Sequence, residues 1–295
     1  AAMPAARAAS ATDLRALVDR LVVQPRVGDL ALAPDGAHLA LQMAQDDKTI
    51  IVVLRRSDGG IAAHMGFGAD THVVDPVWVS PHVVLARLMK RVDKHEAPLG
   101  TGIVYRLDVR DGEAAALNSQ MSGVLRGTEA RGTGAELLDG LADDDEHVLL
   151  HLQGFEDLAP IPEVHRSELA TGRITLVARS PVANAGFVTD AKGQVRIAQG
   201  SPANDVFETW YRESDEAEWQ RLHRAEGEGL AWYALGFSED GQRILFQRQQ
   251  AQGPSRLEWR TIDGGEWSTA WSHPVFDPGA IQWSGNGTPI GVRPA

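Results

Sequence analysis

A glycine-containing turn signal recurs along the chain at intervals of roughly 47 residues, with one longer step. Each copy lies between two short apolar, β-rich runs. The copies are Asp35-Gly36, Lys192-Gly193, Asp240-Gly241 and Asn286-Gly287, with degenerate versions at 80–82 and 143–146. Asp-Gly and Asn-Gly pairs adopt positive φ at low cost, as a two-residue hairpin requires. We therefore predict a two-residue hairpin at each copy, and the interval is typical of β-propeller blades.

A second turn signal follows each of the first five by roughly 23 to 31 residues. These second turns lie at 57–60, 110–112, 170–172, 214–217 and 263–265. Two hairpins per period give four antiparallel strands per period, which is the blade of a propeller. We expect an all-β propeller with blades at about 29–72, 77–120, 137–180, 184–225 and 232–275, and part of a sixth at 277–295.

Residues 1–28 precede the first blade and are expected to form a tail and one short helix. The Ala-rich run 1–11 has no apolar core and is interpreted as what remains after removal of a signal peptide. A periplasmic or secreted protein is therefore expected, and a cytoplasmic one stays open. Residues 12–21 carry apolar side chains at helical spacing, which predicts a helix packed on an end of the propeller or docked on a partner. These side chains are Leu14, Leu17, Val18 and Leu21.

The charge and composition exclude several classes of protein. A net charge of −12 argues against nucleic acid and against an anionic membrane surface as partners. No run approaches the ~20 apolar residues that span a bilayer, so membrane insertion is not expected. The absence of cysteine excludes disulfides, thiolate metal sites and cysteine nucleophiles. The eight tryptophans are expected to pack between blades rather than to form a ligand cage.

The chain shows no signature of a catalytic site. A serine hydrolase of the α/β type needs a Gly-x-Ser-x-Gly elbow, and the sequence has none; residues 282–286 come nearest but lack the first glycine. No glycine-rich phosphate loop precedes a helix. We predict no catalytic residue and no cofactor in this chain.

Two segments have the residue types of a metal site. His147 and His151 share one face of a predicted strand, but the sequence offers no third ligand, so solvated or hydrogen-bonded strand histidines are favoured. The acidic run 143–146 lacks the alternating spacing and central glycine of a calcium loop, and a charged hairpin tip is favoured there. We predict no metal site.

Several segments together resemble a known family. They are LAPDG at 32–36, IVYRLDV at 103–109, SELATG at 167–172, GQVRIA at 193–198, TWYR at 209–212, EWQRL at 218–222, GFSEDG at 236–241 and PIGV at 289–292. In order and spacing they are similar to the propeller of bacterial prolyl oligopeptidase-family (S9) serine peptidases, in the dipeptidyl- and acylaminoacyl-peptidase-like branches. Pro-Asp-Gly hairpins also occur in other propellers, including TolB-like ones.

The resemblance implies a propeller that covers the active site of a C-terminal α/β-hydrolase domain and admits short peptides. That domain, with its Ser, Asp and His triad, is missing from these residues, so no triad position carries over. Some dipeptidyl peptidases hold a substrate amino terminus with paired glutamates, and the loop acids Glu96, Glu156 and Asp157 are the candidates here for substrate binding.

Two interpretations remain. The chain is the non-catalytic propeller portion of an S9-like peptidase, or it is a self-standing TolB-like propeller that binds or scaffolds proteins in the cell envelope. A metal-dependent propeller hydrolase or lactonase is a third and weaker one. A Gly-x-Ser-x-Gly downstream of Ala295 would decide for the first. Five blades and one hairpin leave a strand edge and an apolar face open, so we also expect completion by further chain or by a homo-oligomer. Alternatively, the run 21–27 adds a strand to the sixth blade.

Overall fold

The computed structural model describes residues 27–93, 97–118, 133–154, 159–202, 206–227, 230–284 and 289–295. Every regular element in these ranges is a β-strand. No helix within them is long and apolar enough to cross a membrane. The helix expected at 12–21 lies outside the described residues.

The first two blades are antiparallel sets of four strands. They comprise β1 (Val27–Leu32), β2 (His38–Gln45), β3 (Lys48–Arg55) and β4 (Ile61–Met65), then β5 (Thr71–Trp78), β6 (Val83–Lys90), β7 (Leu99–Asp108) and β8 (Ala114–Ala116). One parallel bridge, between Thr49 and His72, joins the two sets into a single sheet. The Thr49 hydroxyl and His72 Nδ1 lie 3.0 Å apart at this bridge.

Three further four-stranded antiparallel sheets and one hairpin follow. They comprise β9 (Thr133–Asp139), β10 (His147–Gly154), β11 (Glu163–Glu168) and β12 (Ile174–Arg179); β13 (Gly186–Thr189), β14 (Val195–Gly200), β15 (Val206–Tyr211) and β16 (Gln220–Glu226); β17 (Trp232–Phe237), β18 (Arg243–Arg248), β19 (Arg256–Thr261) and β20 (Ser268–Trp271); and β21 (Pro278–Trp283) with β22 (Pro289–Pro294).

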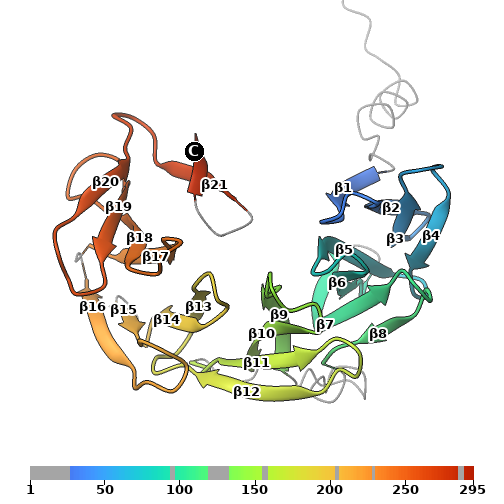
Figure 1. The fold of residues 1–295 in the computed structure, drawn as a ribbon, viewed down its shortest axis with the longest axis horizontal. Coiled ribbons are helices and arrows are strands. Elements are labelled where there is room, and N and C mark those ends of the chain that lie inside the picture. The colour runs from blue at the N-terminus through green and yellow to red at the C-terminus, as the bar shows by residue number, and fades with distance from the viewer. Residues whose placement is uncertain are drawn as a thin grey trace, which may run out of the picture.

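The sheets follow one another along an arc (Figure 1). The first strand of each blade lies toward the inside of the arc, and β4, β8, β12, β16 and β20 lie on its outside. The arc is open between the first blade and the β21–β22 hairpin. The predicted fold class is confirmed: the described chain is an all-β propeller of four-stranded antiparallel blades with part of a sixth.

The first turns of the blades differ in detail from the prediction of two-residue hairpins. Five residues separate β1 from β2, and likewise β13 from β14 and β17 from β18. In each turn the glycine takes positive φ, at +71° for Gly36 and Gly193 and +66° for Gly241, while the preceding residue does not. A two-residue type I′ turn needs positive φ at both central residues, so these turns are longer ones. The Asp35 carboxylate stabilises the first by accepting a hydrogen bond from the backbone N–H of Ala37.

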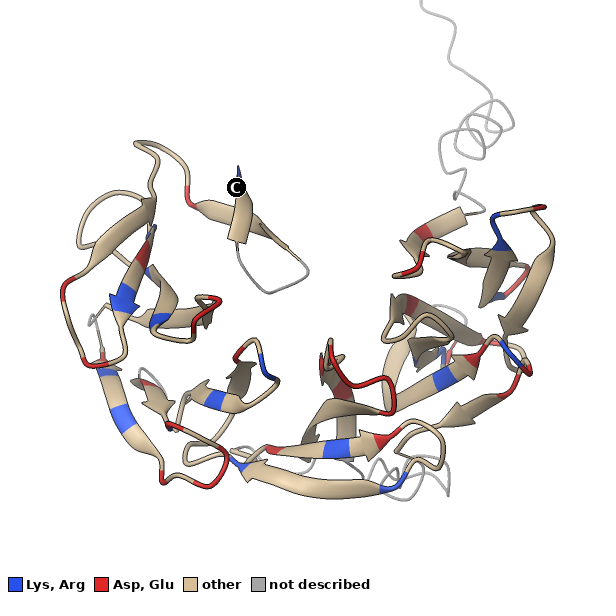
Figure 2. Cartoon of the chain, viewed as in Figure 1, with Lys and Arg blue, Asp and Glu red and all other residues tan. Residues whose placement is uncertain are grey.

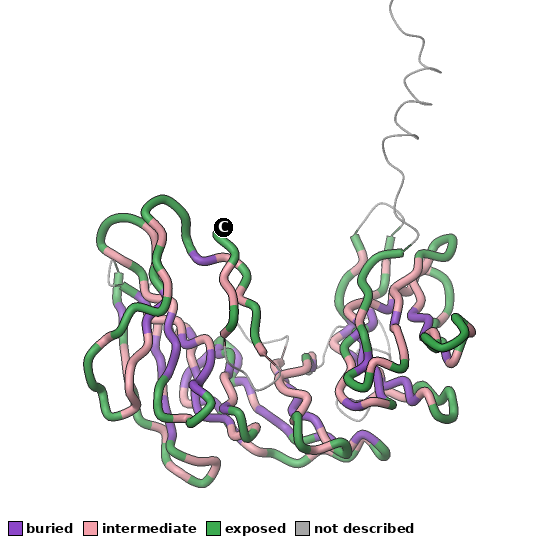
Figure 3. Tube along the Cα trace, turned by 45° about the horizontal axis from the view of Figure 1, so that its top comes forward, coloured by how far each residue is buried: buried purple, intermediate pink, exposed green. Residues whose placement is uncertain are grey.

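Apolar side chains of neighbouring blades form four successive clusters between the sheets, and the buried residues follow these seams (Figure 3). Leu150, with no exposed surface, packs in the cluster between the second and third blades. Trp78, Trp210 and Trp232 pack against three of the clusters. Trp283 lies over Gly236, where a Cβ would come within 2.9 Å of its ring. These tryptophans therefore join blades, as the sequence predicted.

We predict that Leu150→Ala lowers the free energy of unfolding by about 2–5 kcal/mol, because it opens a cavity in a seam that both blades need. Urea unfolding followed by tryptophan fluorescence measures this change. Leu176→Ala, at a position 51% exposed on β12, is the control and should change stability by less than about 0.5 kcal/mol. Equal losses in the two variants would contradict burial between blades.

Candidate functional site

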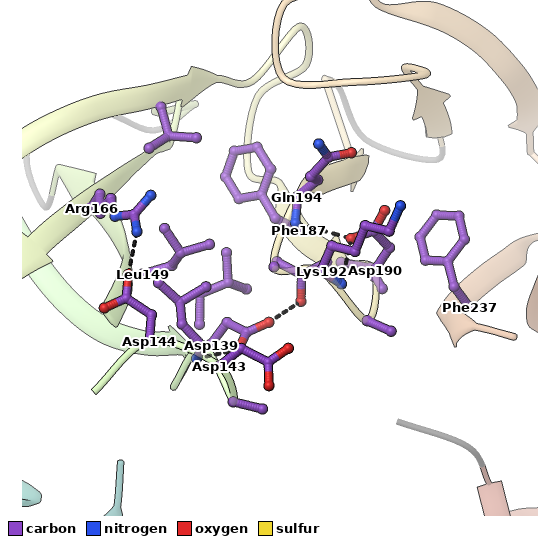
Figure 4. Close-up of a pocket in the computed structure, with 18 of the residues that line it drawn as sticks. Asp139, Asp143, Asp144, Leu149, Arg166, Phe187, Asp190, Lys192, Gln194 and Phe237 are labelled. Carbon is purple, nitrogen blue, oxygen red and sulfur yellow. Dashed lines mark hydrogen bonds and ion pairs between the residues drawn. The ribbon is translucent and has the colours of Figure 1, made fainter. Parts of the chain in front are cut away.

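A hollow of about 1150 Å³ opens between the third and fourth blades, at the end where the first two strands of each blade are joined (Figure 4). Its walls are the β9–β10 turn, the β13–β14 turn and the inner strand β17 of the fifth blade. Ser284, beside the last hairpin, also lines it. Because first strands face the inside of the arc, the hollow lies beside the centre of the propeller.

Asp144 organises the β9–β10 turn. Its Oδ1 accepts hydrogen bonds from the backbone N–H groups of Glu146 and His147, at 3.0 and 3.1 Å. The His147 ring and the Arg166 guanidinium bind the same carboxylate. Burial alone would raise the pKa of Asp144, but these partners outweigh it and lower the pKa to about 2. The carboxylate is therefore held as an anion and fixes the turn against β11.

A second aspartate joins the third blade to the fourth. The Thr189 hydroxyl of β13 donates to Asp139 Oδ2 at 2.5 Å, and the backbone N–H of Leu141 donates to Oδ1 at 2.8 Å. Leu141 adopts φ +54° and lies where a Cβ on Gly193 would be, 2.3 Å from its Cδ2. A Cβ at Gly193 would push aside the end of the Leu141 side chain, and the positive φ of +71° at this position also favours glycine.

Two buried arginines support the β13–β14 turn. Asp190 accepts from the backbone N–H groups of Lys192 and Gln194, both at 3.0 Å, and its Oδ2 lies 2.8 Å from Arg196 Nη1. Arg212 Nη2 donates to Asp215 at 2.5 Å behind this turn. Burial raises the pKa of Asp215, and its ion pair with Arg212 opposes that rise. Each buried arginine of this wall is thus paired with a carboxylate, so removal of one partner would leave an uncompensated buried charge.

Acidic groups outnumber basic ones in the lining. The acids are Asp139, Asp143, Asp144, Asp145, Glu146, Asp190 and Asp215, and the basic residues are Arg166 and Lys192. The acidic run is the red turn between β9 and β10 on the inside of the arc (Figure 2). Asp143, Asp145 and Glu146 are exposed, and their side chains form no hydrogen bond or ion pair with other described residues. These three carboxylates leave a negative charge free at the rim.

The free carboxylates of the lining suit the binding of a cation. Within the described ranges no group of three or more His, Asp or Glu side chains is placed to hold a metal ion. The hydroxyls of Ser180, Ser214 and Ser238 bond to groups within their own turns. A free carboxylate rim attracts a cation, such as a peptide amino terminus or a Lys or Arg side chain.

The predicted substrate-binding acids, Glu96, Glu156 and Asp157, lie outside the described residues. The strands before them, β6 and β10, end at the opposite end of the blades from the acidic hollow. A second hollow of about 390 Å³ lies there, with Arg87, Glu136 and His151 in its lining. The role of Glu96, Glu156 and Asp157 stays a prediction.

The two strand histidines do not act together. His147 binds Asp144, whereas the His151 ring meets the Phe187 ring edge-on at 5.6 Å. Burial lowers the pKa of His151. His147 is hydrogen-bonded, as the sequence favoured, whereas His151 packs against an aromatic ring, which the sequence did not predict.

Sequence reasoning did not single out Asp139, Asp190 or Arg166. The sequence did contain a signal for this acidic site. The first turns of all blades lie at one end of a propeller, so the charged residues of neighbouring first turns can be counted together. The acids at 143–146 and at Asp190 belong to neighbouring first turns.

Comparison with known proteins supports the fold. No family model matches the chain, and no curated protein sequence matches it. Oligogalacturonate lyase in complex with manganese gives a TM-score of 0.50 at 14% identity, over 84% of this chain and 66% of that one. The β-propeller domain of the Trilobed protease from Pyrococcus furiosus, described as having an open velcro topology, gives 0.49 at 10% identity, over 87% and 76%. TolB from Acinetobacter baumannii gives 0.42 at 15% identity, over 81% and 52%.

The chain thus spans about half the length of that TolB and two thirds of the lyase. At these identities the likeness concerns the fold alone. Peptidase propellers and TolB both occur among the similar structures, and the comparison does not separate them.

The low pKa of Asp144 predicts a pH dependence. A carboxyl with a pKa of 3.8 when unfolded and about 2 when folded stabilises the fold above pH 4, and this contribution is lost as the pH falls through about 2. Asp144→Asn should therefore lower the free energy of unfolding at pH 7 by about 2 kcal/mol, with a smaller difference near pH 2. Urea unfolding from pH 7 to pH 2 measures it. Asp145→Asn is the neighbouring control, and a pH-independent loss in Asp144→Asn would contradict the prediction.

Proposed function

We propose that this chain is the non-catalytic propeller portion of a serine peptidase of the prolyl oligopeptidase (S9) type. In this role it binds short peptides and controls their access to a hydrolase domain outside these 295 residues. The observation that carries the proposal is the hollow beside the propeller centre, with its free carboxylates at 143, 145 and 146. A charged amino terminus or a basic side chain is the part of a peptide that such a rim attracts.

Several S9-like segments fall at the turns of the blades, and two of them at equivalent places in the first and fifth blades. Residues 32–36 lead into the first turn of the first blade, and residues 236–241 do the same in the fifth. Residues 167–172 lie at the second turn of the third blade. The resemblance thus follows the repeat itself, and this regularity supports a propeller of the S9 kind.

The inside of the arc suits passage control. The first turn of the fourth blade is held by the buried Arg196–Asp190 ion pair, and that of the third blade by the partly exposed Arg166–Asp144 pair. A peptide entering at this end would meet the free carboxylates at 143, 145 and 146 before it reached a catalytic domain.

The second candidate is a self-standing TolB-like propeller that binds proteins in the cell envelope. The observation that favours it is β22, which pairs with β21 on one side and with no described strand on the other. Such an edge can accept an extended segment of another chain by strand addition. The same edge is where further blades or a second copy of the chain would attach.

We predict that the chain binds short peptides with a free amino terminus and a Lys side chain more tightly than acetylated, acidic peptides of the same length. Isothermal titration calorimetry at low salt measures the affinities. Asp143→Asn/Asp145→Asn/Glu146→Gln should weaken binding of the basic peptide by about tenfold or more, since three uncompensated charges are lost.

The matched control is Asp46→Asn/Asp47→Asn/Glu266→Gln, which removes the same charge from exposed sites away from the hollow. It should leave the affinity unchanged. Equal weakening in both triple variants would mean that net charge, not the hollow, holds the peptide. Binding only of long protein segments, lost in Val292→Pro on the edge strand, would favour the TolB-like candidate.

We also predict that the pure chain does not hydrolyse aminoacyl-nitroanilides or nitrophenyl esters, because it carries no nucleophile elbow. Turnover blocked by a serine-directed inhibitor would contradict this.

A further inference from the structure

Lys192 is the one basic side chain in the lining of the acidic hollow that no other described residue uses. The second basic residue of the lining, Arg166, is bound to Asp144. Lys192 is exposed on the β13–β14 turn, and its ammonium group forms no hydrogen bond or ion pair with another residue that the structure describes. An unpaired ammonium group in a lining that is otherwise acidic is available to a ligand.

The aspartates around Lys192 already have partners. Asp190 accepts a hydrogen bond from the backbone N–H of Lys192 at 3.0 Å, and its Oδ2 lies 2.8 Å from Arg196 Nη1. Asp139, at the end of β9, accepts hydrogen bonds from the Thr189 hydroxyl and from a backbone N–H of its own turn. The β13–β14 turn is thus held by its backbone and by Arg196, and the ammonium group of Lys192 is not needed to hold it.

The unpaired charges of the hollow lie on two different walls. The negative ones, at 143, 145 and 146, belong to the β9–β10 turn of the third blade, whereas Lys192 belongs to the β13–β14 turn of the fourth. Figure 4 shows Asp143 and Lys192 on these separate turns. Apolar side chains, among them Leu141 and Val177, supply much of the remaining lining. Apolar walls reduce the screening of charges by water, so both walls act more strongly on a bound ion than they would in open solvent.

We propose that Lys192 binds the terminal carboxylate of a short peptide whose ammonium group is held by the carboxylates at 143, 145 and 146. This assignment rests on the function proposed above and specifies its ligand, a zwitterionic peptide with a free carboxyl terminus. A hydrogen bond between an ammonium group and a carboxylate is charge-assisted and therefore strong. The acidic wall repels a carboxylate, so the negative end of the peptide is directed to the lysine. The two walls thus set the direction in which the peptide lies.

The size of the hollow limits the length of such a peptide. A sphere of about 1150 Å³ is about 13 Å across, which is the length of about four extended residues. A longer peptide that keeps its ammonium group at the acidic wall carries its terminal carboxylate past Lys192. We therefore expect the effect of the carboxyl terminus to be confined to peptides of about two to four residues.

Isothermal titration calorimetry at low salt compares the tripeptide Lys-Ala-Ala with its C-terminal amide, since the two differ only in the terminal charge. We expect the unaltered chain to bind the free acid about fivefold more tightly than the amide, or better, and Lys192→Met to bind the two equally. The same peptide with four further alanines should show no difference between acid and amide.

The matched control is Lys90→Met, which removes the same charge from an exposed position at the end of β6 in the second blade. It should keep the full preference for the free acid. Lys192→Met should unfold at the same urea concentration as the unaltered chain, because Lys192 has no side-chain partner among the described residues. A lower urea midpoint would show a structural role for this lysine and would count against the assignment.

The triple variant Asp143→Asn/Asp145→Asn/Glu146→Gln separates this assignment from the proposed function. If the triple variant weakens both peptides while acid and amide bind the unaltered chain equally, or while the preference persists in Lys192→Met, the assignment is overturned and the proposed function stands. If the triple variant weakens neither peptide, the proposed function fails and the assignment fails with it. A preference for the free acid that is lost in Lys192→Met and kept in Lys90→Met supports the assignment.

Discussion

The structure depends on apolar contact between neighbouring blades. A four-stranded sheet is too small to bury its own faces, so each blade is stable only where another sheet or segment covers it. The four apolar clusters meet this need for the seams from the first blade to the fifth.

The first turns of the third and fourth blades carry the charged side chains of the candidate site. Aspartates that hold the first turns, such as Asp144 and Asp190, also bring negative charge to one end of the propeller. Their own charges are used by Arg166 and Arg196, so they act as supports. The neighbouring acids at 143, 145 and 146 remain free to act on a ligand. Structural and binding roles are thus divided among adjacent residues of one turn.

Much of the fold could be predicted from the sequence, because the repeat of glycine turns and β-rich runs is local information. The strand pairs around Gly36, Gly193 and Gly241 are examples. The length of these turns could not be predicted, since it depends on whether the residue before the glycine also takes positive φ, and here it does not. The candidate site was missed for another reason: the Asp139–Thr189 bond joins residues 50 apart, and only the packing of two blades brings them together.

We propose that the acidic hollow receives the cationic part of a peptide. A crystal structure of the chain with a bound lysine-containing tetrapeptide tests this proposal. We expect an ammonium group within hydrogen-bonding distance, about 3 Å, of carboxylate oxygens of Asp143, Asp145 or Glu146. A peptide bound instead at the opposite end, beside Arg87 and Glu136, or along the edge of β22, would contradict it.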